Sequence, residues 1–502
     1  WKDNNGGTMV PAAGAIARGY DETGTGESGT KPDVDLTIVK PMLLIEPSEN
    51  LDITFIAEFL TDKSGTANSR NFVNNDALRR TQLFGYTPPE DRYEINHNLM
   101  GGNDLEIETY IGEFNLRTDT GILTGIASYR ELTYDSSTDF DGSPITLFHF
   151  PDNHEEQEQQ TFELRYAGSN SNNIDYVVGI SYFDQEMFVG ERRDFGVVDI
   201  AGVTELQHDS VGIFAELDYM ITDRTKLTFG ARWTEENKEV IFNAIGSCEK
   251  DFSSCSGPSS GLFRSGTYDD TTPKFAITHA LNDDVNIYAS YTQGFRSGSF
   301  DARARTIDSF LNSQPGPEEV TSIELGLKSI LNDGRIMFNL AVFQADYDDI
   351  QKLALEDCVV DTTTCPSGRI QRLINAAVAT IEGIEIETKI NITDQFSIEG
   401  SIGYTDAGFD KFEGFDADGV PGYDPVTDPA AAKALKFERV PELTYNIMAN
   451  YSQPLTSGAE LDFRVSYSYT DDFTNNATTA SSLGNLDDNI MTCCDDLKDY
   501  TK

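Results

Sequence analysis

The chain has 502 residues, of which 37 are basic and 84 acidic, giving a formal charge of −47. Such a charge argues against a nucleic-acid-binding protein, which needs a basic face. No run of apolar residues is long enough for a transmembrane helix, whereas a membrane barrel stays open because its alternating strands dilute the hydropathy signal. We interpret the excess of acidic residues as a feature that keeps the protein soluble or suits it to a saline habitat. The alternative is that acidic residues on the loops bind divalent cations.

Alternation of apolar and polar residues is the main structural signal. In 227–233 and 461–469 every odd-numbered residue is apolar, and the even-numbered ones are polar or glycine. This period of two predicts strands with one apolar face. The strands run for about 11–15 residues, against a usual length of about 5–6 in globular proteins. A tilted strand needs about 9–11 residues to cross a bilayer, so the lengths favour membrane strands.

Short polar turns join these segments in pairs, such as Ser210–Ile221 with Lys226–Thr234 and Gln395–Thr405 with Glu460–Tyr469. Longer loops rich in Gly, Asp and Asn separate the pairs. The expected turns are Glu46–Asn50, Arg117–Thr120, Ser169–Asn173, Thr222–Thr225, Asn282–Asp284, Asn332–Gly334, Asn391–Asp394 and Pro454–Gly458. The expected loops are 62–103, 134–156, 189–207, 242–269, 297–317, 351–377 and 409–439.

The sequence therefore predicts an all-β fold, a transmembrane antiparallel β-barrel of about 16 strands with short periplasmic turns and long extracellular loops. Because the first strand, 35–45, runs into a short turn, residues 1–34 and 471–502 are expected to be extracellular loop segments. Intact barrels of this kind have periplasmic termini, so we expect 1–502 to be part of a larger barrel. Plugged transporters have about 22 strands, which would leave about six outside this chain.

Six cysteines occur as three local pairs. Cys248 and Cys255 share a long loop, as do Cys358 and Cys365, with the same spacing in both pairs. Two such pairs suggest the disulfides Cys248–Cys255 and Cys358–Cys365 in an oxidising compartment. A zinc site is the weaker alternative, since no His lies near them. The pairing of the adjacent Cys493 and Cys494 is left open.

Several segments resemble the TonB-dependent receptor family of outer-membrane importers. Residues 287–300, IYASYTQGFRSGSF, resemble a family strand that ends in a GF(K/R)SG loop. Residues 317–351 resemble its PE…ELGLK…DGR hairpin. Further similar segments are 162–168, 214–238, 379–389 and 440–451. Each motif is moderately specific, and their shared order along the chain strengthens the match.

The resemblance implies a receptor in the outer membrane of a Gram-negative bacterium. Such a protein binds a scarce nutrient, siderophore-like or another organic molecule, at its extracellular loops and imports it with TonB energy. The TonB–ExbB–ExbD system would act through a plug domain that is not present in this chain. Lipopolysaccharide and other outer-membrane lipid, and a surface lipoprotein, are further expected partners. The alternatives are a passive porin-like channel and a surface adhesion or phage-docking barrel.

Basic and aromatic residues gather in and after the GFRSG loop, which stands out in so acidic a chain. Guanidinium groups bind carboxylate or phosphate bidentately, so an anionic ligand is one interpretation. The alternatives are local salt bridges or contact with lipopolysaccharide phosphates. The candidate ligand-binding residues are Phe295, Arg296, Phe300, Arg303 and Arg305.

Two acidic loops resemble partial calcium loops, in which aspartates precede a glycine. They contain Asp135, Asp139 and Asp141 before Gly142, and Asp416 and Asp418 before Gly419. Neither reaches a clear acidic residue at the twelfth position, and a solvated turn is the simpler interpretation. No cofactor besides this calcium is expected.

The sequence does not predict an enzyme. Glu385 and Glu387 lie on one face of a strand, which a hydrolase could use, but a barrel lumen is polar by default. We interpret Glu324, Lys328, Glu385, Glu387, Lys389, Asp462 and Arg464 as lumen wall. Outward aromatics are expected to form interfacial girdles, namely Tyr129, Tyr182, Tyr219, Trp233, Tyr291, Tyr404, Tyr467 and Tyr469.

Overall fold

A computed structural model describes residues 34–65, 101–140, 148–170, 173–194, 199–245, 261–304, 307–357, 369–412 and 437–474, with a few short stretches between and beyond them. No helix in these parts of the chain is long and apolar enough to cross a membrane. The expected external segments 1–34 and 471–502 fall almost wholly outside the described residues.

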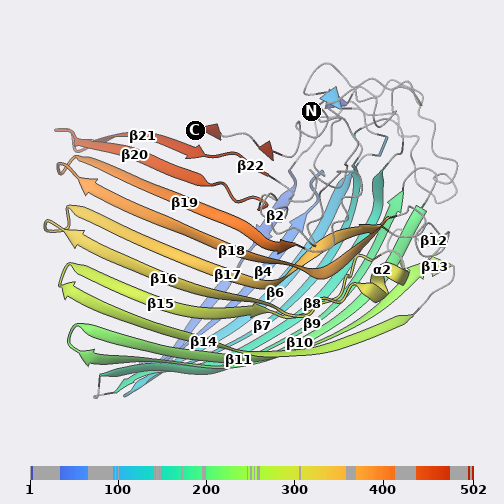
Figure 1. The fold of residues 1–502 in the computed structure, drawn as a ribbon, viewed down its shortest axis with the longest axis horizontal. Coiled ribbons are helices and arrows are strands. Elements are labelled where there is room, and N and C mark those ends of the chain that lie inside the picture. The colour runs from blue at the N-terminus through green and yellow to red at the C-terminus, as the bar shows by residue number, and fades with distance from the viewer. Residues whose placement is uncertain are drawn as a thin grey trace.

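The chain forms one antiparallel sheet that curves into a barrel wall (Figure 1). Its long strands are β2 (Leu36–Val39), β3 (Met42–Ser48), β4 (Leu51–Asp62), β6 (Gly102–Thr118), β7 (Gly121–Asp139), β8 (His149–Asn170), β9 (Ile174–Asp194), β10 (Asp199–Thr222), β11 (Thr225–Ile245), β14 (Leu262–Asn282), β15 (Val285–Arg296), β16 (Glu318–Leu331), β17 (Ile336–Asp357), β18 (Arg369–Asn391), β19 (Phe396–Phe412), β20 (Leu443–Pro454) and β21 (Glu460–Thr470). The one described helix is α2 (Ile307–Asn312).

Seven two-residue strands accompany the wall. They are β1 (Lys2–Asp3), β5 (Glu94–Ile95), β12 (Ser247–Cys248), β13 (Cys255–Ser256), β22 (Phe473–Thr474), β23 (Asp496–Leu497) and β24 (Tyr500–Thr501). β24 extends the main sheet by pairing with β21. The others form three small separate ladders.

Each wall strand pairs with the next one along the chain. β2 and β3 both pair with β4 and form one strand interrupted at Lys40 and Pro41. With that strand counted once, the described wall has the sixteen long strands expected from the sequence, so the predicted fold class is confirmed. In the described part of the chain no ladder joins β3 to β21, and most side chains of both strands are exposed on both faces.

The eight predicted tight turns are confirmed, and they lie at one end of the wall (left in Figure 1). The turn between β16 and β17 places Asn332, Asp333 and Gly334 at φ of 54°, 54° and 82°. This left-handed region is tolerated by glycine, asparagine and aspartate, which explains the composition of the turn.

Four predicted loops were much too long, and one predicted pair was wrong. Within the expected loop 242–269, β11 runs to Ile245 and β14 begins at Leu262. The expected loop 189–207 is largely strand, because β9 runs to Asp194 and β10 begins at Asp199. β7 and β8 likewise extend into 134–156, and β17 and β18 into 351–377. Beyond the membrane the outward face of a strand no longer has to be apolar, so the alternation ends while the hydrogen-bonded ladder continues. The segment Gln395–Thr405 pairs with β20 rather than with Glu460–Tyr469, which is β21.

The two faces of the wall differ as predicted. The outward face exposes apolar side chains such as Phe229, Phe275 and Leu325. On the loop side of this band, the hydroxyl of the outward Tyr110 donates a hydrogen bond to Glu108, and that of the outward Tyr182 donates to Asp184. Aromatic rings therefore mark the edge of the apolar band.

The opposite face is a polar lumen wall. The Tyr288 hydroxyl donates to Glu324 at 2.5 Å, and Lys328 lies 5.7 Å from the Tyr288 ring centroid. Lys389 pairs with Glu399 at 2.6 Å. Such pairing within the wall suits a polar lumen.

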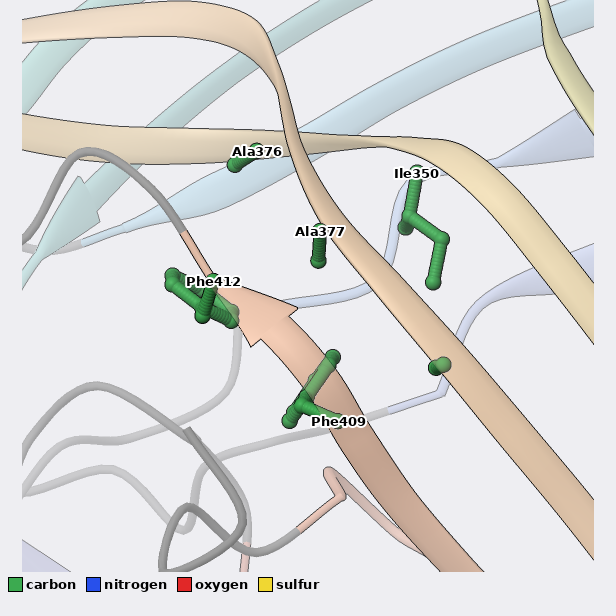
Figure 2. Packing of buried hydrophobic residues seen from close by; sticks show 6 residues of the cluster. Ile350, Ala376, Ala377, Phe409 and Phe412 are labelled. Carbon is green, nitrogen blue, oxygen red and sulfur yellow. The ribbon is translucent and has the colours of Figure 1, made fainter. Parts of the chain in front are cut away.

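Hydrophobic clusters occur at the loop end of the wall, where packed segments cover the strands. Ile350, Ala376, Ala377, Phe409 and Phe412 form one cluster over β17, β18 and β19 (Figure 2). The Phe409 ring stands edge-on to Phe412, at 5.0 Å between centroids. The second cluster fixes the loop between β15 and β16, described next.

Candidate functional site

The loop that joins β15 to β16, residues 297–317, folds onto the inner face of the wall. Phe300 and Phe310 pack against Val240 and Phe242 of β11. The Phe242 and Phe310 rings stack at 5.0 Å with an interplanar angle of 21°. Thr204 of β10 donates a hydrogen bond to Ala302 O at 2.8 Å. The loop is thus an inward-folded strap at the extracellular mouth of the lumen.

A charged cluster fixes the first residues of the strap. The Glu236 carboxylate accepts the Ser297 hydroxyl at 2.5 Å, and it lies 3.1 Å from Nε2 of His208. Lys238 donates to Ser297 Oγ at 2.5 Å and to Gly298 O at 3.1 Å. The hydrogen bond from His208, with those from Ser297 and the charge of Lys238, lowers the pKa of Glu236 to about 2 despite its burial. Glu236 is therefore ionised at neutral pH.

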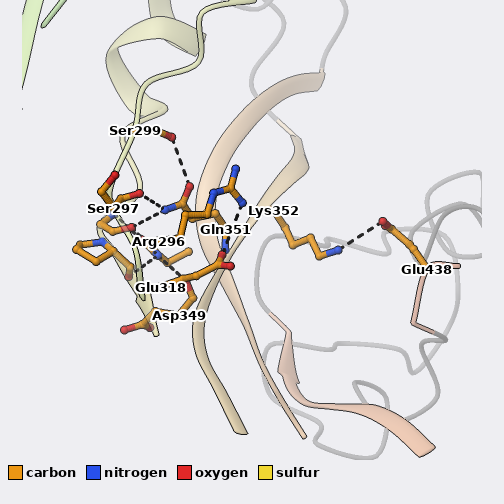
Figure 3. A network of polar contacts seen from close by, with 11 residues as sticks. Arg296, Ser297, Ser299, Glu318, Asp349, Gln351, Lys352 and Glu438 are labelled. Carbon is orange, nitrogen blue, oxygen red and sulfur yellow. Dashed lines mark hydrogen bonds and ion pairs between the residues drawn. The ribbon is translucent and has the colours of Figure 1, made fainter. Parts of the chain in front are cut away.

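Side chains of β17 and β18 hold the other end of the strap, and Figure 3 shows Gln351 among them. Gln351 Nε2 donates to Ser297 O at 2.8 Å and to Gly316 O at 3.1 Å. The backbone N–H of Gln351 donates to the Glu318 carboxylate at 2.7 Å. Asn375 Nδ2 donates to Gly316 O and Pro317 O, and its Oδ1 accepts the Gly316 amide. The two ends of the strap are therefore tied together as well as to the wall.

Arg303 of the strap meets Arg193 of β9 and Phe150 of β8. Arg303 donates two hydrogen bonds to Glu191 of β9, at 2.9 and 2.7 Å, and Arg193 donates to the same carboxylate at 2.7 Å. The guanidinium carbons of Arg193 and Arg303 lie 5.6 and 5.9 Å from the Phe150 ring centroid. Two cations share one carboxylate, and the Arg303 side chain is 60% exposed. This group can offer hydrogen-bond donors to an anion.

The structure divides the predicted ligand-binding residues. Arg303 joins the cluster with Glu191 and Phe150, whereas Phe300 is buried in the packing of the strap. The Arg296 side chain stays 63% exposed, 3.9 Å from Glu318, and Phe295 lies on β15 opposite Glu319. Arg305 lies outside the described residues. Their ligand role stays a prediction.

Sequence reasoning missed Arg193, Phe150 and Glu191. All three lie on strand extensions beyond the membrane, which the sequence had assigned to loops. The run of charges at 191–194 was the available signal.

The predicted calcium residues do not come together where they are described. Asp135 lies 2.8 Å from Nδ1 of His154, and Asp139 is buried beside His149 at 3.5 Å. Asp141, Asp416 and Asp418 lie outside the described residues. No group of three or more potential metal ligands is found in the part of the chain that the structure describes. Calcium binding stays a prediction.

The cysteine pairs are described only in part. In the ladder of β12 and β13, Cys248 and Cys255 are opposite each other. Their side chains lie outside the described residues, as do Cys358, Cys365, Cys493 and Cys494. The backbone pairing is consistent with a Cys248–Cys255 disulfide, and both disulfides stay predictions.

An apolar outer band with aromatic rings at its edge and a polar inner face define a transmembrane β-barrel of the outer-membrane type. Residues 48–501 match the family model "TonB dependent receptor-like, beta-barrel", so the chain belongs to this family. The predicted resemblance and outer-membrane location are thereby confirmed. The family comprises transport receptors rather than enzymes.

Solved structures share the fold at low sequence identity. The ferric yersiniabactin uptake receptor FyuA from Yersinia pestis is 13% identical with a TM-score of 0.69, over 93% of this chain and 62% of that one. The siderophore receptor PiuA from Acinetobacter baumannii is 15% identical with a TM-score of 0.67, over 93% and 67%. The copper transporter OprC is 12% identical with a TM-score of 0.61, over 94% and 64%. The chain thus spans about three fifths to two thirds of the length of these proteins.

Proposed function

We propose that this chain forms the wall and mouth of a receptor that binds a scarce nutrient outside the cell and imports it with TonB energy. The observation that carries the proposal is the strap, which is anchored to strands on both sides of the β15–β16 pair and holds its Arg303 beside Arg193. The family assignment supports energised import, and the similar proteins include the ferric yersiniabactin uptake receptor FyuA and the siderophore receptor PiuA. In this proposal TonB, ExbB and ExbD act through a plug segment, and bond-making chemistry has no part.

The arginine pair supports an anionic nutrient, such as a carboxylate-bearing chelate. Each charge-assisted hydrogen bond to a ligand contributes about 1.5–3 kcal/mol. Outer-membrane lipid is the proposed neighbour of the apolar band, and a surface lipoprotein is a proposed accessory. Calcium on the extracellular loops stays part of the proposal.

The test is uptake in the native host, measured with and without the gene. Cells are limited in turn for iron, copper or cobalamin, and accumulation of the labelled nutrient is followed. We expect deletion of this gene, or of TonB, to reduce uptake of one nutrient to the same extent. Uptake that survives the loss of TonB would identify a passive channel. Unchanged uptake of every nutrient, with loss of phage or surface attachment, would favour the docking barrel.

A matched pair of variants tests the mouth. Arg193→Gln with Arg303→Gln should raise the half-saturating nutrient concentration about tenfold or more, as expected for losing charged hydrogen bonds. Arg335→Gln removes an arginine that pairs with Asp394 at the turn end, and it should leave uptake unchanged. Equal uptake by both variants would exclude Arg193 and Arg303 from ligand binding.

A further inference from the structure

The extracellular end of β9 carries packed side chains on both of its faces. Its ladder with β10 is unbroken, so successive residues alternate in direction. Glu191 and Arg193 point inward, where they contact the strap. Gly190 and Arg192 therefore point outward, on the same face as the exposed Tyr182. Although this face lies beyond the apolar band, Arg192 is fully buried there.

Phe252, from the segment between β11 and β14, covers this outward face. A Cβ on Gly190 would come within 2.4 Å of the Phe252 ring, so the ring lies directly on the glycine. The Arg192 guanidinium carbon lies 6.0 Å from the ring centroid. Ala201 and Val203, which pair with this part of β9, are buried as well. The outer face of the wall is thus packed directly behind the arginine pair of the mouth.

A buried ion pair joins Arg192 to the neighbouring strand β8. Arg192 Nε donates to Asp152 Oδ2 at 3.2 Å, and the two side chains are 0% and 2% exposed. Taking two charges out of water is costly, so such a pair adds little net stability. Its structural effect is to join the ends of β8 and β9 at one defined place.

A β-bulge in β8 sends neighbouring side chains to opposite faces. Between the ladder pairs that flank 150–152, β8 has one residue more than β9. Bulges redirect side chains, and Pro151 suits one because it has no N–H for the ladder. Strict alternation would place Phe150 and Asp152 on one face. Instead Phe150 contacts the inward guanidinium groups, whereas Asp152 pairs with the outward Arg192.

Phe252 has a backbone conformation that bulky residues rarely adopt. Its φ is 57°, in the left-handed region, and only 6% of its surface is exposed. Such a conformation is kept only where the surrounding packing enforces it, and it occurs preferentially at functional sites. The contacts of the ring with Gly190 and Arg192 supply that packing.

We propose that Asp152, Arg192 and Phe252 form an outer clamp, which holds the arginine pair of the mouth in the geometry that binds an anionic nutrient. They are positioning residues, because their side chains lie on the outer side of the wall. The clamp fixes β9 on one face and thereby Arg193 on the other, and the bulge fixes Phe150 beside both inward guanidinium groups. This inference rests on the proposed function, in which the arginine pair meets the nutrient.

The first test measures this geometry without a ligand. The full-length receptor in detergent is treated with phenylglyoxal, which modifies arginine side chains, and each modified residue is located by tandem mass spectrometry. Phe252→Gly removes the ring, and glycine suits the positive φ. We expect Arg193 to react about threefold faster, as for the opening of a partly exposed ion pair, and the buried Arg192 to become reactive. Arg335 at the turn end should react at an unchanged rate.

The second test is uptake by cells, measured with labelled ferric citrate, copper or cobalamin, whichever nutrient the deletion test identifies. Phe252→Gly should raise the half-saturating concentration about tenfold, as for the loss of one charged hydrogen bond, and leave the maximal rate unchanged. Gly190→Ala should have the same effect, because its Cβ displaces the Phe252 ring. In the Phe252→Gly background Gly190→Ala should have no further effect, since both changes remove the same contact.

Two control variants separate positioning from a general loss of packing. Phe412→Ala removes a ring that is fully buried in the other loop-end cluster. Gly408→Ala adds a Cβ that meets no atom within 4 Å. Both should leave the reactivity of Arg193 and the half-saturating concentration unchanged. The heat-dependent mobility of each variant on gels shows that its barrel is folded.

The clamp is overturned if Arg193 reacts equally in Phe252→Gly and wild type, or if Phe412→Ala has the same effect as Phe252→Gly. A fall in maximal uptake rate without a change in half-saturating concentration would reduce the clamp to a structural role and overturn the proposal. These outcomes are distinct from a failure of the proposed function. Uptake that does not depend on TonB, with the expected arginine reactivities, would overturn only the import function.

Discussion

Replacing Glu236 with Gln should loosen the strap at its first residues. The carboxylate holds Ser297 directly and Lys238 at 3.2 Å. Its pKa is lowered from 4.5 to about 2, which corresponds to about 3 kcal/mol of stabilisation of the ionised form. The side chain is one-fifth exposed, so solvent screening reduces this contribution to about 2 kcal/mol. Of the groups that lower this pKa only Ser297 belongs to the strap, so loss of its one hydrogen bond to the charged carboxylate, about 1.5 kcal/mol, should make local opening of the strap about tenfold more frequent in Glu236→Gln.

Hydrogen exchange of the amides in 297–304, measured by mass spectrometry and corrected for intrinsic rates, reports this opening. Ionised Glu236 contributes fully above pH 4.5, and its contribution declines as pH falls toward its folded-state pKa of about 2. Protection in the wild type should thus weaken below about pH 4.5, and Glu236→Gln should lack this dependence. Glu216→Gln removes another inward carboxylate–lysine pair and should leave the strap unchanged. Equal exchange in Glu236→Gln and wild type at neutral pH would refute the reasoning.

Three further predictions concern the wall and the strap. Leu325→Arg places a charge on the outward apolar face and should cost about 2–4 kcal/mol in urea-monitored insertion into lipid vesicles. Phe242→Ala removes the partner of the stacked Phe310 ring and should lower the local stability of the strap by about 3 kcal/mol. The measurement is faster trypsin cleavage after Arg303. Gly326→Ala would place a Cβ 2.2 Å from the Tyr288 ring, and the resulting overpacking should reduce the stability of the barrel by about 1–3 kcal/mol. The measurement is a lower unfolding temperature on heated gels.

The sequence predicts the wall well because the membrane imposes a simple pattern on it. Residues such as Phe229 and Trp233 face lipid, and Thr228 and Arg232 face the lumen, so the period of two is unbroken. The turns are predictable for a local reason, since the conformation at Asn332 and Asp333 suits few other residues.

The mouth was less predictable, because its strands leave the membrane before they end. Residues 189–194 are strand, yet they carry Glu191, Arg192 and Arg193 in succession, and no face is apolar there. A segment of this composition is predicted as a loop from its sequence, although its hydrogen-bonded ladder with β10 is unbroken. Length beyond the membrane is set by pairing with the neighbouring strand, which a local pattern does not encode.

Arg303 illustrates why the site itself needed the structure. The sequence singled it out as one of several arginines after the GFRSG motif, with a ligand or a local salt bridge as its expected partner. The structure pairs it with Glu191, which is 112 residues away in the chain. The same carboxylate also holds Arg193, so one negative charge fixes two guanidinium groups without neutralising both. A salt bridge and an anion site are therefore compatible at this position: Glu191 orients the arginines, and the remaining positive charge is what an anionic nutrient would meet.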